Sequence, residues 1–297
     1  MQTRSSGFTM TELMIALVIM ILVTSQIMLA YMNQHQHSMS HERVVQSQEE
    51  VRLVTDVMLA DLRMAGFMVD ETAAVGSLDG GANAPDVLCV SDPSAIDDMV
   101  LVDAQARFDG AKVTSAVAAS ASSIVLSAAT RDIDGDGTDD FANVGGIIIS
   151  SGTEVHCGEV TGVTGNTVSF TPSTPAGFSA TIADAFVVPA LVYRVASDQL
   201  TRNGAVLSSQ IEDLQVEFGV DADANGMIEN AEFPIDDLSG QNLRRLRTAR
   251  VHVTAKTPRA ELDYTGQFTA IANRAAGATD SFKRRRVSAD ALLRNLR

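Results

Sequence analysis

The chain has 297 residues, a formal net charge of −15, no tryptophan and only 5% aromatic residues. Acidic residues concentrate between residues 67 and 240, and basic residues between 241 and 297. So acidic a middle region argues against nucleic-acid binding and suits divalent cations or a solvated surface. The scarcity of aromatic rings argues against a surface that stacks on bases or sugars.

The amino-terminal segment begins with a polar leader that ends at Gly7, and it continues as an uncharged apolar run from Leu13 to Ala30. As a helix this run would span roughly 27 Å, about the thickness of the hydrocarbon core of a bilayer. No small-x-small cleavage site follows the run, which argues against an ordinary secretory signal. Glu12 is a carboxylate at the edge of the run, and such a group is costly there unless it finds a partner.

The sequence from Phe8 to Gly66 predicts one long helix, because it contains no proline and no glycine before Gly66. Beyond a polar stretch, apolar residues return at helical spacing, at Val44, Val51, Val54, Met58 and Leu62. These residues share one helix face. We therefore expect the first half to pack among neighbouring helices and the second half to be covered by a sheet, with Gly66 as the C-cap.

After Phe67 the pattern changes to β-rich runs bounded by Gly, Pro, Asn or Asp. The expected strands lie at 147–149, 167–170, 186–188, 190–195, 214–220, 250–257 and 284–292. Along 214–220 apolar and polar residues alternate, which indicates a strand with one buried face. Residues 111–129 are rich in Ala, Ser and Val, and they predict either a strand pair or a loosely packed insertion.

The two cysteines, Cys89 and Cys157, lie in short apolar stretches. If the apolar run anchors the chain and most of the chain is exported, a disulfide between them is permitted, and only one pairing is possible. The alternative is a pair of buried free thiols.

The segment from Asp221 to Glu232 matches the twelve-residue EF-hand calcium loop at its diagnostic positions. The residues at the ligand positions are Asp221, Asp223, Asn225, Met227, Glu229 and Glu232. Met227 would offer its carbonyl, Glu229 a contact through water, and Glu232 a bidentate carboxylate, while Gly226 allows the sharp turn. Because a strand precedes the loop and Pro234 follows it, we expect a grafted calcium loop and not an EF-hand domain. The alternative is an acidic surface turn without metal.

A second acidic loop begins at Asp132 and starts like the first. Its possible calcium ligands are Asp132, Asp134, Asp136, Thr138 and Asp140. Its twelfth position is Asn143, which cannot chelate as a carboxylate does. The sequence leaves open whether this loop binds a second ion.

Motifs of catalysis are missing from the sequence. It contains no G-x-S-x-G elbow, P-loop, H-E-x-x-H or dinucleotide fingerprint. The clustered carboxylates have the spacing of ligands, so we do not expect an enzyme.

The run Gly7-Phe8-Thr9-Met10-Thr11-Glu12-Leu13 resembles the class III signal of type IV prepilins and pseudopilins. The resemblance implies cleavage between Gly7 and Phe8 by a prepilin peptidase, followed by N-methylation of Phe8. It also implies that Glu12 faces the terminal amine of a neighbouring subunit during assembly.

Several later segments are similar to the PilW-type minor pilins. They are Asp61 to Phe67, Leu191 to Arg194, Gln199 to Arg202, Ile211 to Asp221, Arg284 to Val287 and Leu292 to Leu296. The resemblance implies an α+β, type IV pilin-like fold, in which a long N-terminal helix packs on an antiparallel β-sheet head with inserted loops. The expected divisions are a leader at 1–7, a helix at 8–66 with a membrane span at about 13–30, and a head at 67–297.

The expected function is that of a minor pilin that primes or joins assembly of a type IV pilus, with a calcium-stabilised head. Its expected partners are other pilins, the prepilin peptidase and the inner membrane, with no nucleic acid. The head would lie in the periplasm and later on the pilus or cell surface. The alternatives are a J-type pseudopilin of type II secretion and a calcium-dependent adhesin at a filament tip.

Overall fold

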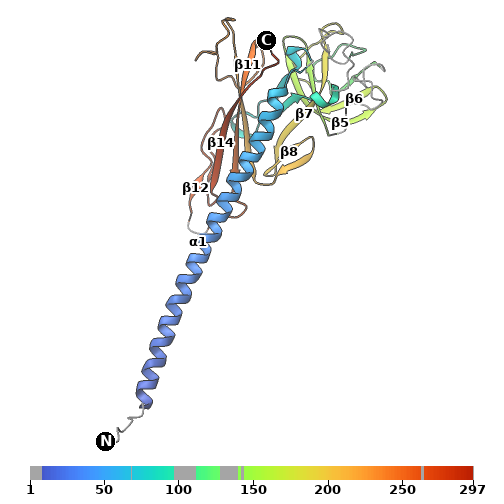
Figure 1. Ribbon diagram of the computed structural model, residues 1–297. Coiled ribbons are helices and arrows are strands. Elements are labelled where there is room, and N and C mark those ends of the chain that lie inside the picture. The colour runs from blue at the N-terminus through green and yellow to red at the C-terminus, as the bar shows by residue number, and fades with distance from the viewer. Residues whose placement is uncertain are drawn as a thin grey trace, which may run out of the picture. The chain divides into compact units, whose positions relative to one another are not determined.

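The computed structural model describes residues 9–67, 69–96, 112–127, 140–141, 144–261 and 264–296. A long helix, α1 (Met10–Met64), precedes a series of antiparallel strands, which confirms the α+β, pilin-like fold class predicted from the sequence (Figure 1). The chain forms two compact units, Met1–Gln46 and Ser47–Arg297, and we describe each by itself.

The first unit contains the amino-terminal part of α1. Its large apolar side chains between Met10 and Met32 are exposed to the surroundings. The apolar stretch has a mean hydropathy of 2.5, so by length and composition this helix can cross a membrane. A helix that is apolar on all sides requires lipid or other helices around it.

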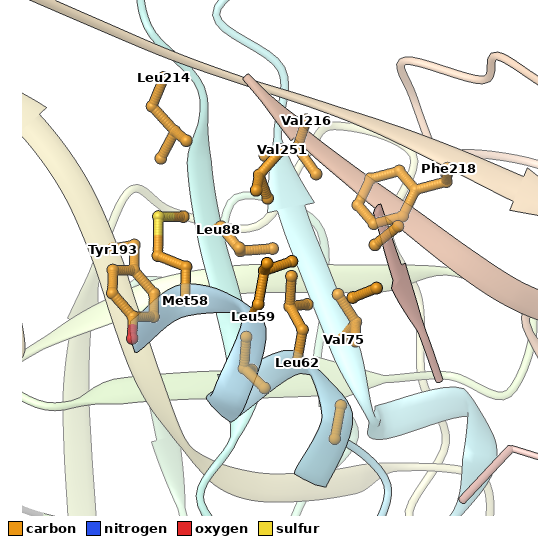
Figure 2. Close-up of a cluster of buried hydrophobic side chains, with 14 of the residues drawn as sticks. Met58, Leu59, Leu62, Val75, Leu88, Tyr193, Leu214, Val216, Phe218 and Val251 are labelled. Carbon is orange, nitrogen blue, oxygen red and sulfur yellow. The ribbon is translucent and has the colours of Figure 1, made fainter. Parts of the chain in front are cut away.

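The second unit, the head, is built around residues 47–64 of α1. Val51, Val54, Met58 and Leu62 are buried on one face of the helix, as the spacing of apolar residues predicts. Figure 2 shows Met58, Leu59 and Leu62 among side chains from several strands, including those of Leu88, Val216 and Val251. Leu53, on the opposite face, is 63% exposed.

The end of α1 is fixed by the carboxyl terminus of the chain. The Asn295 side-chain amide donates hydrogen bonds to the carbonyl oxygens of Met64 and Ala65, both at 3.2 Å. Gly66 has a φ of +76°, and a Cβ there would lie 2.6 Å from a methyl group of Leu296. Glycine therefore both ends the helix and lets the carboxyl-terminal segment pack against it.

Two sheets make up most of the head. The larger sheet has the order β1-β2-β7-β4-β5-β6-β3, with β8 paired to β7 and β9 paired to β8. Its strands are β1 (Val75–Leu78), β2 (Val87–Ser91), β3 (Ser123–Val125), β4 (Gly146–Ser150), β5 (Val155–Thr164), β6 (Thr167–Thr171), β7 (Phe186–Ala196), β8 (Gln199–Arg202) and β9 (Ala205–Ser208).

The smaller sheet has three antiparallel strands in the order β10-β11-β14. They are β10 (Ile211–Val220), β11 (Leu246–Lys256) and β14 (Arg284–Leu292). A two-stranded ribbon, β12 (Gly266–Gln267) and β13 (Thr279–Asp280), lies between β11 and β14 in the sequence. Short 3₁₀ turns are η1 (Glu71–Ala73), η2 (Gly81–Asn83), η3 (Pro93–Ile96) and η5 (Leu243–Arg245).

The runs 186–188 and 190–195, predicted as two strands, form the single strand β7. Pro189 lies within this strand and faces the β2 side, because its carbonyl oxygen accepts the backbone N–H of Asp92, just beyond the end of β2. The nitrogen and the carbonyl of a strand residue point to the same side. The missing N–H of Pro189 therefore falls where β2 has ended, and no ladder bond to β4 is lost.

Cys89 on β2 and Cys157 on β5 form a fully buried disulfide. These strands are not neighbours in the sheet, because β7 and β4 lie between them. The sheet therefore curls until β5 faces β1 and β2. Gly76 on β1 permits this approach, since a Cβ there would lie 3.2 Å from Cβ of Cys157.

Asp86 ties the loop before β2 to β10. Its carboxylate accepts the backbone N–H groups of Gly80 at 2.9 Å and Val216 at 2.8 Å, and its own N–H donates to the carbonyl of Leu214. The side chain is only 4% exposed. Burial raises the pKa of this carboxyl from its ordinary 3.8 to about 7, against the opposing effect of the two hydrogen bonds.

We expect Leu62→Ala to lower the free energy of unfolding by about 2–5 kcal/mol, because it opens a cavity in the shared core. Leu53→Ala, on the exposed face of the same helix, should change it by less than about 0.5 kcal/mol. Chemical denaturation of both variants checks this. Similar losses in the two variants would contradict the assignment of the buried face.

Asp86 should make the head less stable as the pH rises. Between its ordinary pKa of 3.8 and about 7, the unfolded chain has released the proton that the folded chain still holds. The free energy of unfolding therefore falls through this window, by about 2–3 kcal/mol between about pH 5 and about pH 8. In Asp86→Asn this part of the pH dependence should disappear. Denaturation curves of both proteins at the two pH values measure it, and an unchanged slope would contradict the prediction.

Candidate assembly and calcium sites

Glu12 forms a capping box with Thr9 at the start of α1. The Glu12 carboxylate accepts the Thr9 backbone N–H at 2.9 Å and its hydroxyl at 2.8 Å, and the backbone N–H of Glu12 lies 3.4 Å from the Thr9 hydroxyl oxygen. The pattern Thr-x-x-Glu is the usual sequence signature of this cap, which was not among the roles predicted for Glu12. Gly7 and Phe8, the predicted processing residues, lie outside the described residues.

The predicted calcium loop, residues 221–232, follows directly after β10. Backbone hydrogen bonds close its base: the N–H of Val220 donates to the carbonyl of Glu232, and Phe218 and Ile235 exchange bonds of 2.8 and 3.0 Å. Gly219 leaves room beside the base, since a Cβ there would lie 3.2 Å from the Ile228 side chain. The loop therefore leaves and re-enters the sheet at one place.

The structure brings Asp221, Asp223 and Glu232 together, with one carboxylate oxygen of each within 4.8 Å of the others. Asp221 and Glu232 are buried, whereas Asp223 is exposed. Gly226 makes the sharp turn with a φ of +82°. Residues far apart in the loop thus meet because the chain reverses at Gly226.

Backbone N–H groups hold two of these carboxylates in place. Asp221 accepts the N–H of Asn225 at 3.0 Å and of Gly226 at 3.1 Å. Glu232 accepts the N–H of Ala222 at 2.6 Å through one oxygen, and that of Glu229 at 3.0 Å through the other. These bonds fix the direction of the oxygens, as a site for a hard cation requires.

The side chain of Asn225 connects two further carboxylates. Its amide donates to Asp223 at 2.9 Å and to Glu229 at 3.3 Å, and its oxygen accepts the N–H of Met227 at 2.7 Å. The loop has four carboxylates, and the guanidinium of Arg247 provides a positive charge near them, 3.9 Å from the Asp221 carboxylate. Oxygen donors of this kind suit Ca²⁺, and the three converging carboxylates fit that ion, while Glu229 lies outside their cluster and the Asn225 oxygen is bonded to Met227.

Of the second acidic loop, Asp132, Asp134, Asp136 and Thr138 lie outside the described residues. Asp140 is described, but it does not define a site by itself. A second calcium site therefore stays a prediction.

Two polar clusters that were not predicted from the sequence hold α1 against the strands of the head. Arg202 donates to the Asp61 carboxylate at 2.8 and 3.3 Å, and the Tyr193 hydroxyl donates to the same carboxylate. Burial, and then the bond to Asp61, raise the pKa of Tyr193 above its ordinary value. Glu50 binds Gln210 at 2.7 Å and also the Ser208 hydroxyl.

A comparison with protein families matches the carboxyl-terminal part of the chain. Residues 178–295 match the family described as Type IV Pilus-assembly protein W (PilW). This segment includes β7 to β14, with the acidic loop 221–232 and the Tyr193–Arg202 cluster. The comparisons with curated proteins and with solved structures give no match. The carboxyl-terminal part of the chain is thus similar to the PilW family, and the long helix before an antiparallel head is consistent with a pilin-like fold.

Proposed function

We propose that the protein is a minor pilin that joins or primes the assembly of a type IV pilus, and that calcium stabilises its head. The observation that carries the proposal is the match to the PilW family in the head of a chain that begins with an exposed apolar helix. The match supports a pilus role over that of a type II secretion pseudopilin. The residues that carry this proposed role act in assembly and stability, and none of them is proposed to be catalytic.

Assembly follows from the first unit of the chain. The apolar side chains between Met10 and Met32 stabilise a membrane-bound subunit, and they can exchange lipid for the same helix of neighbouring subunits. Cleavage between Gly7 and Phe8 would create an amine next to Thr9, close in sequence to Glu12. Removing Glu12 from water is costly, and a neighbour's ammonium group offsets that cost.

The capping box gives Glu12 a second task before assembly. In the separate subunit its carboxylate satisfies the N–H of Thr9, so it is not left without a partner. Loss of such a cap costs only about 1 kcal/mol of helix stability. A strong assembly defect in a Glu12 variant would therefore exceed what fraying of the helix end explains.

Calcium acts on the head. Four loop carboxylates, at Asp221, Asp223, Glu229 and Glu232, repel one another, and a divalent cation removes this repulsion. Because the base of the loop is hydrogen-bonded to β10, an ion that orders the loop stabilises the end of that strand as well. Binding to the folded state alone raises stability by mass action.

We expect Glu12→Ala to be nearly absent from sheared filaments while the membrane pool persists. Glu42→Ala, an exposed carboxylate on the same helix, should enter filaments normally. Immunoblots of both fractions measure the distribution. N-terminal sequencing of the membrane-extracted wild type should begin at Phe8. A chain that begins at Met1, or normal incorporation of Glu12→Ala, would refute the assembly mechanism.

The full chain in detergent should melt roughly 5–10 °C higher with calcium at a hundred times its dissociation constant than with chelator. Asp221→Asn and Glu232→Gln should abolish the shift, because each removes a ligand charge. Asp237→Asn, just beyond the loop, should keep it. Thermal melting and titration calorimetry check these outcomes. No shift and no heat in the wild type would exclude calcium while leaving the assembly role untouched.

A further inference from the structure

The two edges of the three-stranded sheet differ. The outer edge of β10 is covered, because Asp86 bonds to Leu214 and Val216, and Ile235 bonds to Phe218. Across the described parts of the chain, β14 forms its backbone ladder with β11 alone. An open strand edge of this length is a template for pairing with another strand.

The register shows which backbone groups of β14 point outward. The N–H of Leu293 donates to the carbonyl of Arg247, and the N–H of Thr257 donates to the carbonyl of Lys283. These bonds continue the β11–β14 ladder, which has no bulge. In an antiparallel pair, bonded residues alternate with non-bonded ones. The N–H and C=O groups of the alternate residues Arg284, Arg286, Ser288, Asp290 and Leu292 therefore point away from β11.

The side chains of these residues lie on the face of the sheet away from α1, because their neighbours Val287, Ala289 and Ala291 pack on the core. Ser288 and Leu292 are exposed, and the Asp290 side chain is 60% exposed. The charges along the edge run from Arg286 through a neutral Ser288 to a negative Asp290. Arg286 is partly buried, and its guanidinium already donates to the Thr254 hydroxyl at 3.1 Å and to the Thr269 carbonyl at 2.6 Å, so it contributes its charge and its remaining N–H groups.

This order of charges is complementary to the same order on a second strand that runs in the opposite direction. Two antiparallel copies of β14 centred on Ser288 would place Arg286 of each copy opposite Asp290 of the other. Centring the pair on Asp290 would instead oppose two carboxylates, and centring it on Arg286 would oppose two guanidinium groups. Like charges directly opposite one another destabilise a strand pair, so the charges select one register.

We propose that β14 is a docking edge for a second copy of this chain, which pairs antiparallel with it about Ser288 and joins two heads into one six-stranded sheet. Each Asp290 keeps Arg250 of its own sheet, at 2.6 Å, and adds Arg286 of the other copy through its exposed side. The pairing is isologous, so the same residues serve both copies and the contact closes at two.

The direction of pairing assigns the contact to separate filaments. A twofold axis normal to the sheet reverses every direction in its plane, including that of residues 47–64 of α1, which pack on its inner face. In the proposed filament the apolar helices of neighbouring subunits pack in parallel, so neighbours within it cannot pair in this way. The contact therefore joins heads of two filaments, an inference that rests on the proposed pilus function.

Single cysteines test the register. The native cysteines are both in the buried disulfide, so an added thiol is the only free one. Opposite residues in a bonded pair have Cα atoms about 5.5 Å apart, within disulfide range. In the detergent-solubilised full chain under mild oxidation, Ser288→Cys should form roughly ten times more covalent dimer than Leu292→Cys, whose copies would lie some eight residues apart along the strands.

Since Ser288 also bonds to His252, a mixture of Arg286→Cys and Asp290→Cys chains provides a second test that leaves Ser288 intact. This mixture should give the mixed dimer in preference to either dimer of identical chains. By sedimentation, Asp290→Arg should reduce dimerisation roughly tenfold, and Arg286→Asp combined with Asp290→Arg should restore it.

A monomeric Ser288→Cys chain, or equal crosslinking of Leu292→Cys, would overturn the proposal. Failure of the double exchange to restore the dimer would also overturn the register. None of these outcomes bears on Glu12 or on filament formation, so the pilus role and the docking edge can fail separately.

Discussion

The apolar face of α1 between residues 47 and 64 is the contact on which the head depends. The two sheets are separate in their strand pairing, yet the same cluster of buried side chains includes Leu88 of the larger sheet and Val216 and Val251 of the smaller one. Met58 and Leu62 of the helix lie in this cluster (Figure 2). Without the helix, each sheet would expose an apolar face to water.

Charged anchors fix the rotation of the helix within this contact. Asp61 and Glu50 reach strands β7 to β10, where they meet Arg202 and Gln210. A slip of one residue would turn the helix by about 100° and carry both anchors and the apolar face away from the sheets. The apolar contact thus supplies the stabilisation, and the polar anchors supply the register.

Elements with a strong local pattern could be predicted from the sequence. The apolar spacing and Gly66 define the buried face and the end of α1, and the alternating tail gives β14 its observed bounds, Arg284–Leu292. The region 70–145 was harder to interpret. It contains β1, whose Gly and Ser have little strand propensity, and β2, a short apolar run that periodicity alone does not assign to a strand, yet Val75 and Leu88 are part of the core. Tertiary packing decides such strands.

The same distinction holds for the sites. The cluster of Asp221, Asp223 and Glu232 could be predicted because its residues lie within one twelve-residue segment and a single turn brings them together, while calcium binding there stays a prediction. The Asp61–Tyr193–Arg202 cluster could not, because it joins residues more than a hundred positions apart. The capping box at Thr9 and Glu12 is also local, since its two residues lie three positions apart in the sequence. Local chemistry is visible in a sequence, whereas contacts across the fold are not.

The Cys89–Cys157 bond also bears on how the head behaves under load. In the proposed filament, tension would strain the subunits, and a strand pulled from the larger sheet would ordinarily release the chain behind it. The bond encloses a separation of 68 residues, which as free chain would extend by roughly 230 Å. The disulfide prevents this segment from extending even when the noncovalent contacts of the sheet are broken. A stretched head would therefore yield over a short distance and recover with β2 still held against β5.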